Sequence, residues 1–236
     1  TIQILSNFVN DYYDYKNGLD KQGRIGFKRA LAEGSVSLNQ MKIAIGIDLL
    51  VAAIIGLYLV IHGGIIILII GVFSLLFAWL YTATKKSLSY LGIADIFCFI
   101  FFGPVATLGT TALQTGEFSV GSMYLGMVCG SLATCVLIVN NIRDRETDKL
   151  NNKQSFVVRF GKKAGEMEYL FFIILALFFS FMANGLSFSN LIIVLGLLLF
   201  SQLLKAEGEK YNTMLIKTGL LNVAFVILSI IDLYIK

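Results

Sequence analysis

The sequence predicts an all-α membrane protein with several transmembrane helices, and two observations lead to this fold class. Hydrophobic residues make up 57% of the 236 residues and charged residues only 14%, whereas a soluble domain carries about 25% charged residues. The apolar residues also gather in seven runs that reach or approach the length needed to cross a hydrocarbon core of about 30 Å.

The seven predicted spans follow one another with short polar breaks and form one domain over residues 1–236. They lie near residues 43–61, 65–83, 93–113, 120–139, 168–183, 186–204 and 218–235, the fifth being the shortest. Pro104 follows Gly103 inside the third span and predicts a kinked helix. Residues 1–9 resemble the end of an earlier span, and the first residue is Thr, so we expect further sequence upstream.

The basic residues predict how the spans are oriented. All of the 19 Lys and Arg residues except Lys236 fall in segments on one side of the alternating spans. The positive-inside rule makes that side cytoplasmic. The net charge of +4 then follows from the topology and indicates no nucleic-acid partner. Three cysteines, Cys98, Cys129 and Cys135, lie in apolar spans and are expected to be buried thiols rather than disulfides or metal ligands.

The two long loops predicted on the cytoplasmic side carry similar clusters of amides, carboxylates and cations. The first contains Asn10, Asp11, Asp14 and Asp20, followed by Arg24, Lys28 and Arg29; the second contains Asn140, Asn141, Arg143, Asp144 and Asp148, followed by Lys149 and Lys153. Each cluster follows the end of an apolar run. This weak internal repeat is expected to bring the two clusters together from two halves of a helical bundle.

The spacing of the carboxylates indicates what the clusters bind. Asp11 and Asp14 are three residues apart, and Asp144 and Asp148 are four apart, so each pair falls on one helix face. Facing carboxylates repel unless a cation lies between them. An oxygen-only donor set suits Mg²⁺, which recruits phosphate oxygens from a substrate, and nearby Arg and Lys side chains suit the remaining diphosphate oxygens.

Two other interpretations remain open at this point. The charges could be ordinary solvated side chains, although matching clusters on the same side make this less convincing. The protein could also be a membrane cation carrier, because Asp48, Asp95 and Asp232 lie inside or at the edges of spans. Carriers place their sites near the bilayer midplane, whereas most of these acids lie at the cytoplasmic ends.

The motifs resemble a known family of membrane enzymes. The segments NDYYDYKNGLD at 10–20, SYLGIADIFCFIFFGPVATLGT at 89–110 and NNIRDRETDKLNNKQS at 140–155 are similar to the UbiA superfamily of intramembrane prenyltransferases. They look most like its 1,4-dihydroxy-2-naphthoate polyprenyltransferases of menaquinone biosynthesis. Asp95, where this branch is expected to carry Glu, and Lys28, where relatives often carry Pro, depart from the pattern.

The resemblance implies a bundle of nine transmembrane helices around a central cavity. Seven of these and the end of another would be present here, with helix one and most of helix two missing. It also implies a Mg²⁺ site with Asp11, Asp14, Asp144 and Asp148 as the central acids and Asn10 and Asp20 as further ligands. Arg24, Arg29, Arg143 and Lys153 would stabilise the departing diphosphate, and Tyr81, Lys85 and Tyr90 would contact the aromatic acceptor.

The implied reaction transfers a polyprenyl group from polyprenyl diphosphate to 1,4-dihydroxy-2-naphthoate. Diphosphate and CO₂ are lost, and demethylmenaquinone forms. A related enzyme that uses 4-hydroxybenzoate is the alternative within the family. We expect a multi-pass protein of the bacterial plasma membrane, with its active site on the cytoplasmic side; the sequence predicts neither the prenyl chain length nor the oligomeric state.

Overall fold

The computed structural model describes residues 2–18, 29–80 and 88–235, and these residues form helices and turns with no strand. The helices are α1 (Ile2–Lys16), α2 (Leu38–Leu80), α3 (Leu88–Leu91), α4 (Ala94–Ile100), the π-helix η1 (Phe101–Val105), α5 (Ala106–Thr115), α6 (Val120–Leu150), α7 (Phe156–Phe160), α8 (Lys162–Asn184), α9 (Phe188–Leu203) and α10 (Lys210–Ile235). The predicted all-α fold class is confirmed.

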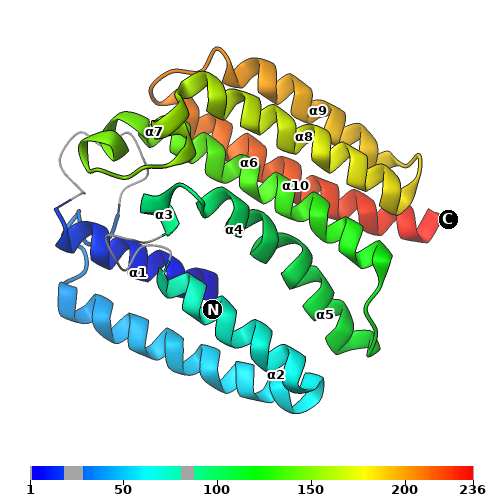
Figure 1. The fold of residues 1–236 in the computed structure, drawn as a ribbon, viewed down its shortest axis with the longest axis horizontal. Coiled ribbons are helices and arrows are strands. Elements are labelled where there is room, and N and C mark those ends of the chain that lie inside the picture. The colour runs from blue at the N-terminus through cyan, green and yellow to red at the C-terminus, as the bar shows by residue number, and fades with distance from the viewer. Residues whose placement is uncertain (1, 19–28, 81–87, 236) are drawn as a thin grey trace.

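The apolar helices match the predicted transmembrane spans. Five segments of the described chain are long and apolar enough to cross a membrane, namely Leu38–Leu80, Ala94–Thr115, Val120–Leu150, Lys162–Asn184 and Lys210–Ile235, while Phe188–Leu203 is a shorter apolar helix. Helix α2 supplies two predicted spans because Gly64, at φ 68° and ψ −158°, reverses its direction, and Figure 1 shows its two halves side by side. Exposed aliphatic side chains such as Ile47, Leu57 and Ile61 suit a lipid-facing surface.

The third predicted span is interrupted as its proline suggested. Gly103 in η1 has φ −110° and ψ −110°, and Pro104 follows it inside the π-helix. The bend packs directly on Gly126 and Gly130 of α6, where a Cβ on Gly130 would overlap the carbonyl oxygen of Phe99. This small-xxx-small pattern lets two backbones approach closely in a membrane bundle.

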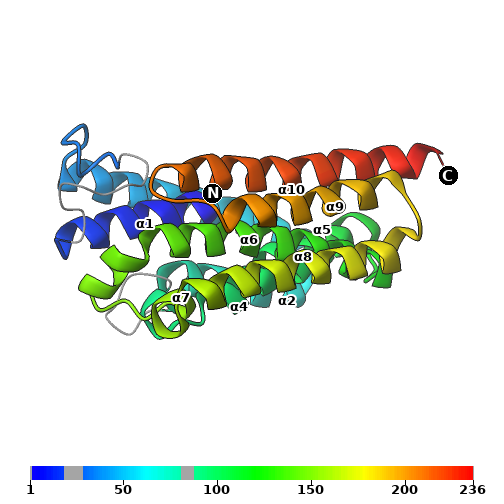
Figure 2. The same ribbon diagram turned by 90° about the horizontal axis from the view of Figure 1, so that it is seen from above.

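Helix α6 lies at the centre of the packed half of the molecule. It contacts α4, η1, α8 and α10, and α6, α8, α9 and α10 run side by side in both views (Figures 1 and 2). Its buried residues Leu132, Cys135 and Ile138 belong to the main hydrophobic core. Cys98, Cys129 and Cys135 are free thiols; Cys135 is buried as predicted, whereas Cys98 and Cys129 are only half-buried.

The charged clusters lie on helices that continue past the apolar spans. Asn10 to Asp14 belong to α1, and Asn140 to Asp148 belong to α6, so the second cluster is not in the loop that its polarity suggested. The C-terminal ends of α1 and α6, together with α3 and α7, lie at the same end of the bundle (Figure 1). This end corresponds to the predicted cytoplasmic side.

Candidate functional site

The first cluster is built on the last turns of α1. Asp14 is buried, with its side chain only 4% exposed. Oriented by its hydrogen bonds, the side-chain amide of Asn10 donates to Asp14 Oδ2 at 3.1 Å and accepts from Arg29 Nη2 at 3.2 Å. One helix turn separates Asn10 from Asp14, which explains why the two side chains meet. Asp11, on the same helix, is half-buried.

Asp14 also contacts two cations from distant parts of the chain. Arg29 Nη1 lies 2.7 Å from Asp14 Oδ2, and Lys153 Nζ lies 3.4 Å from the same oxygen. A buried carboxylate is costly unless it is paired and hydrogen-bonded, and these two cations supply the pairing. Asp14 therefore contacts one cation that follows the first motif, Arg29, and one that follows the second motif, Lys153.

The second cluster is organised by one guanidinium group. Arg143 donates from Nε to Asp144 Oδ1 at 2.7 Å and from Nη2 to Asp144 Oδ2 at 2.8 Å. The same guanidinium donates to Asn140 Oδ1 at 2.6 Å and to Asn212 Oδ1 of α10 at 3.0 Å. Its side chain is 2% exposed. A two-point carboxylate contact of this kind is both strong and directional.

Lys153 joins the two clusters. Its ammonium lies 3.4 Å from Asp14 Oδ2 and 3.9 Å from Asp148 Oδ1. The chain reverses after α6 because Asn152 adopts a positive φ of 57°, and the backbone N–H of Lys153 donates to the carbonyl of Asp148 at 2.9 Å. Carboxylates from two motifs 134 residues apart thus reach one positive group, which is the arrangement predicted from the internal repeat.

Tyr90 of α3 borders the same group of charges. Lys153 Nζ lies over its ring, 5.9 Å from the centroid. Burial is the largest cause that raises the pKa of the Tyr90 hydroxyl, and the negative charges of Asp14 and Asp148 add to it. The hydroxyl therefore stays protonated and can donate a hydrogen bond beside the carboxylates.

The predicted site residues fall into three groups in the structure. Asn10, Asp14, Arg29, Tyr90, Asp148 and Lys153 come together around one centre, and Arg143 and Asp144 form the adjacent buried pair. Asp11 shares α1 with Asn10 and Asp14. The remaining candidates lie outside the described residues: Asp20, Arg24, Tyr81 and Lys85.

Two side chains at this end have partners that the sequence gives no reason to expect. Asn212 accepts from Arg143 across 69 positions of sequence, and Asp95 accepts a hydrogen bond from Asn141 across 46. The only sequence signal was the placement of an acid, Asp95, at the cytoplasmic end of an apolar span. Asn212 follows a polar turn and carries no such signal.

The donor types at this end of the bundle are those that a hard divalent cation prefers. Within the ranges that the structure describes, no group of three or more His, Cys, Asp and Glu side chains could hold a metal ion, and Asp14 and Asp144 are paired with cations. The available donors are nevertheless carboxylate and amide oxygens from both motifs, and Lys153 shows that one positive group reaches acids of both. Such oxygens are the ligands of Mg²⁺ rather than of softer metals.

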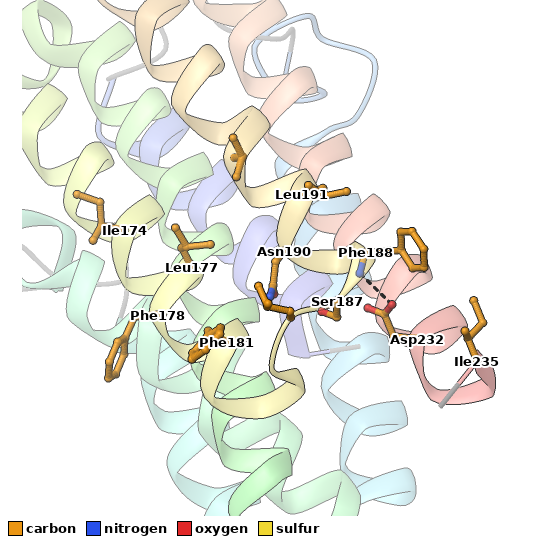
Figure 3. A pocket seen from close by; sticks show the side chains of 12 residues that line it. Ile174, Leu177, Phe178, Phe181, Ser187, Phe188, Asn190, Leu191, Asp232 and Ile235 are labelled. Carbon is orange, nitrogen blue, oxygen red and sulfur yellow. Dashed lines mark hydrogen bonds between the residues drawn. The ribbon is translucent and has the colours of Figure 1, made fainter.

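An apolar groove lies at the other end of the bundle. It has a volume of ≈ 810 Å³ and lies between α8, α9 and α10 (Figure 3). Asp232 at its edge accepts from the backbone N–H groups of Phe188 and Ser189 at 3.1 and 3.0 Å. Its carboxylate thus caps the first turn of α9, where a negative charge is favourable, and takes no part in the carboxylate site.

This is a multi-pass helical membrane protein with two carboxylate clusters converging at one end of its bundle. Comparison with known protein families matches residues 1–214 to the UbiA prenyltransferase family. The chain therefore belongs to the UbiA prenyltransferase family. No solved structure matches it.

Several curated relatives carry the same descriptive name. The 1,4-dihydroxy-2-naphthoate octaprenyltransferase of Escherichia coli is 36% identical over 167 residues, 68% of this chain and 54% of that protein. Proteins of the same name from Haemophilus influenzae and Mycobacterium tuberculosis are 29% and 32% identical, over 85% and 69% of this chain and 68% and 56% of their own lengths. The chain thus spans a little over half of the E. coli and M. tuberculosis proteins.

Proposed function

We propose that the protein transfers a polyprenyl group from a polyprenyl diphosphate to 1,4-dihydroxy-2-naphthoate in menaquinone biosynthesis. The observation that carries this proposal is the convergence of Asp14 and Asp148 on Lys153, at 3.4 and 3.9 Å. It supports a single site that combines carboxylates for a metal with cations for phosphate. The names of the similar bacterial proteins support the choice of acceptor.

Mg²⁺ would be held by Asn10, Asp14, Asp144 and Asp148, with Asp11 and Asp20 in support. When bound, the ion neutralises the diphosphate and lowers the energy of its departure. Arg29 and Lys153, which both contact Asp14, would donate to the diphosphate oxygens. Arg24 is a further candidate for this role. These cations act on negative charge that grows as the leaving group separates, so they favour the transition state over the bound substrate.

Prenyl transfer then requires the aromatic acceptor to lie next to the allylic carbon. The bond between the allylic carbon and oxygen breaks, and its electron pair leaves with the diphosphate. The electron-rich ring attacks the allylic cation, a new carbon–carbon bond forms, and the carboxylate departs as CO₂, which gives the reduced form of demethylmenaquinone. Tyr90, with its protonated hydroxyl beside Asp14 and Asp148, is a candidate contact for the acceptor, as are Tyr81 and Lys85.

The position of the site supports its assignment to the cytoplasmic face of the plasma membrane. The charged end of the bundle holds Arg29, Arg143 and Lys153, whereas the opposite end holds the apolar groove capped by Asp232. The positive-inside rule places the former in the cytoplasm. Polyprenyl diphosphate would then enter with its head group at this surface and its tail in the bilayer.

Product identification tests the proposal. Purified membranes containing the chain are supplied with polyprenyl diphosphates of several lengths and with 1,4-dihydroxy-2-naphthoate or 4-hydroxybenzoate, with and without Mg²⁺, and the products are identified by mass spectrometry. We expect a decarboxylated prenyl naphthalene product only with the naphthoate and Mg²⁺. A prenylated hydroxybenzoate would show that 4-hydroxybenzoate is the acceptor instead. If no diphosphate is released with either of the two acceptors and any of the donors, cation transport becomes the better explanation.

A further inference from the structure

We propose that Asp95 and Asn212 are positioning residues that fix the rotation of the second carboxylate motif about the axis of α6, and this inference rests on the proposed function. Asp95 lies in the first turn of α4 and is 3% exposed. Its Oδ1 accepts from Asn141 Nδ2 of α6 at 3.1 Å. Asn212 of α10 accepts from Arg143 Nη1 at 3.0 Å. Both contacts attach the motif helix to a neighbouring helix.

The two contacts lie on opposite sides of the motif. On an α-helix each residue advances by about 100°, so Asn140, Asp144 and Asp148 form one face. Asn141 lies about 60° to one side of the middle of this face and Arg143 about 100° to the other. A hydrogen bond on one side only would leave the helix free to turn about that point. Contacts on both sides oppose rotation in either direction.

The rotation of α6 must be fixed because a bound metal ion tolerates little movement of its ligands. With its side chains an α-helix is about 10–12 Å across, so a rotation of about 20° moves a carboxylate by about 2 Å. Mg²⁺ requires ligands at about 2.0–2.1 Å in nearly ideal octahedral geometry. A displacement of this size would remove an oxygen from the ligand sphere. Neighbours that orient a metal ligand commonly affect metal affinity by about 10–100-fold.

The packing around Asp95 supports its role as a fixed point. Gly92, three residues earlier, has a φ of 70° and lies so close to the segment after α6 that a Cβ would overlap the carbonyl oxygen of Gln154. The start of α4 is thus held against the residues next to Lys153. Asp95 therefore reaches Asn141 from a backbone that is itself attached to the end of the motif helix.

The test measures binding rather than turnover. The full chain is purified in lipid nanodiscs, and binding of Mn²⁺ with inorganic diphosphate is followed by electron paramagnetic resonance. Asp95→Ala and Asn212→Ala should each weaken this binding about tenfold or more, whereas Asp95→Asn and Asn212→Asp keep the accepting oxygen and should stay within about threefold of the wild type. If Asp95→Ala does not fold, Asn141→Ala breaks the same hydrogen bond from α6 and replaces it.

Thr218→Val is the matched control. Thr218 lies on α10 like Asn212, and its hydroxyl forms a buried hydrogen bond to Tyr169 of α8 at 3.2 Å, away from the motif. This variant should lose thermal stability like Asn212→Ala but bind Mn²⁺ and diphosphate like the wild type. Equal binding by the alanine variants and the wild type, or an equal loss in Thr218→Val, would overturn the positioning roles alone. Failure of the wild type to bind, or unchanged binding in Asp148→Asn, would overturn the proposed function and this inference together.

Discussion

Asp144 combines two requirements in one side chain. Its two oxygens accept from Arg143 at 2.7 and 2.8 Å, and the proposed function also assigns it to the metal. A carboxylate has about four lone-pair sites, so one group can serve both partners. Arg143, 2% exposed, is accordingly better suited to hold Asp144 than to reach out to a substrate phosphate.

Substitution of Asp144 separates its charge from its structural contact. Asp144→Asn keeps an oxygen for Arg143 and should remain folded while losing Mg²⁺-dependent diphosphate release by at least about 100-fold. Asp144→Ala additionally leaves a buried cation unpaired, which typically costs about 3–5 kcal/mol of stability. Diphosphate release and thermal unfolding are measured on both variants. Full activity in Asp144→Asn would remove Asp144 from the metal site.

Lys153 provides the second prediction at this scale. Lys153→Met removes the ammonium that contacts Asp14 and Asp148 but keeps a similar apolar stem, and it should raise the KM for polyprenyl diphosphate about tenfold or more because a charge-assisted hydrogen bond is lost. Lys149→Met, at an exposed position in the last turn of α6, is the control. An equal change in both variants would show only a general charge effect.

The site residues were predictable by type but not by partner. Carboxylates at helical spacing followed by cations led to the prediction of Asp14, Asp148 and Lys153, whose side chains meet in the structure, because charge and spacing are properties of the sequence. The contact of Arg143 with Asn212 spans 69 positions and depends on how α10 packs on α6. Local patterns carry no information on such a contact, since it forms only in the folded bundle.

At the scale of the elements, the two motif helices extend beyond the apolar spans. The polarity of residues 140–150 suggested a loop, but α6 continues to Leu150. Arg, Glu and Lys are good helix formers, and water can satisfy the outer side chains once the helix leaves the hydrocarbon. This extension places Asp144 and Asp148 on one rigid face, which suits a metal site better than a loop does.

The junction before α4 leaves no room for a side chain larger than that of glycine. Gly92 adopts a φ of 70°, and a Cβ there would meet Gln154. Gly92→Ala should therefore displace α3 and Tyr90 from Lys153, lower the thermal midpoint and raise the KM for the acceptor. Gly219 lies in helix α10 with open space around an added Cβ. Gly219→Ala should therefore leave the thermal midpoint and the KM for the acceptor unchanged. Wild-type values for Gly92→Ala would show that the junction tolerates movement.

At the scale of the whole molecule, the sequence predicted the spans well. As far as the structure describes them, the seven predicted spans fall on helices or their ends, because hydrocarbon permits little else for an apolar segment. Which helices pack against one another was harder to predict from the sequence. The close contact of α6 with α4 and η1 depends on the small residues Gly126 and Gly130, whose partners a single sequence does not reveal.

The orientation of the bundle can be tested by labelling. Leu186, 91% exposed in the turn between α8 and α9, should lie outside the cell, and Lys149 should lie inside. A membrane-impermeant maleimide should therefore label Leu186→Cys in intact cells and Lys149→Cys only after permeabilisation, with the unsubstituted chain as the background. The reverse pattern would place the carboxylate site on the outer face.

A double-mutant cycle tests most directly whether the two carboxylate clusters form one metal–diphosphate site. Mg²⁺-dependent diphosphate release is measured for Asp14→Asn, Asp148→Asn and the double variant, each checked for folding. Residues that act as a unit are strongly non-additive, so we predict that each single variant loses most of the activity and that the double variant is little worse than the weaker single one. Independent losses that multiply in the double variant would contradict a shared site.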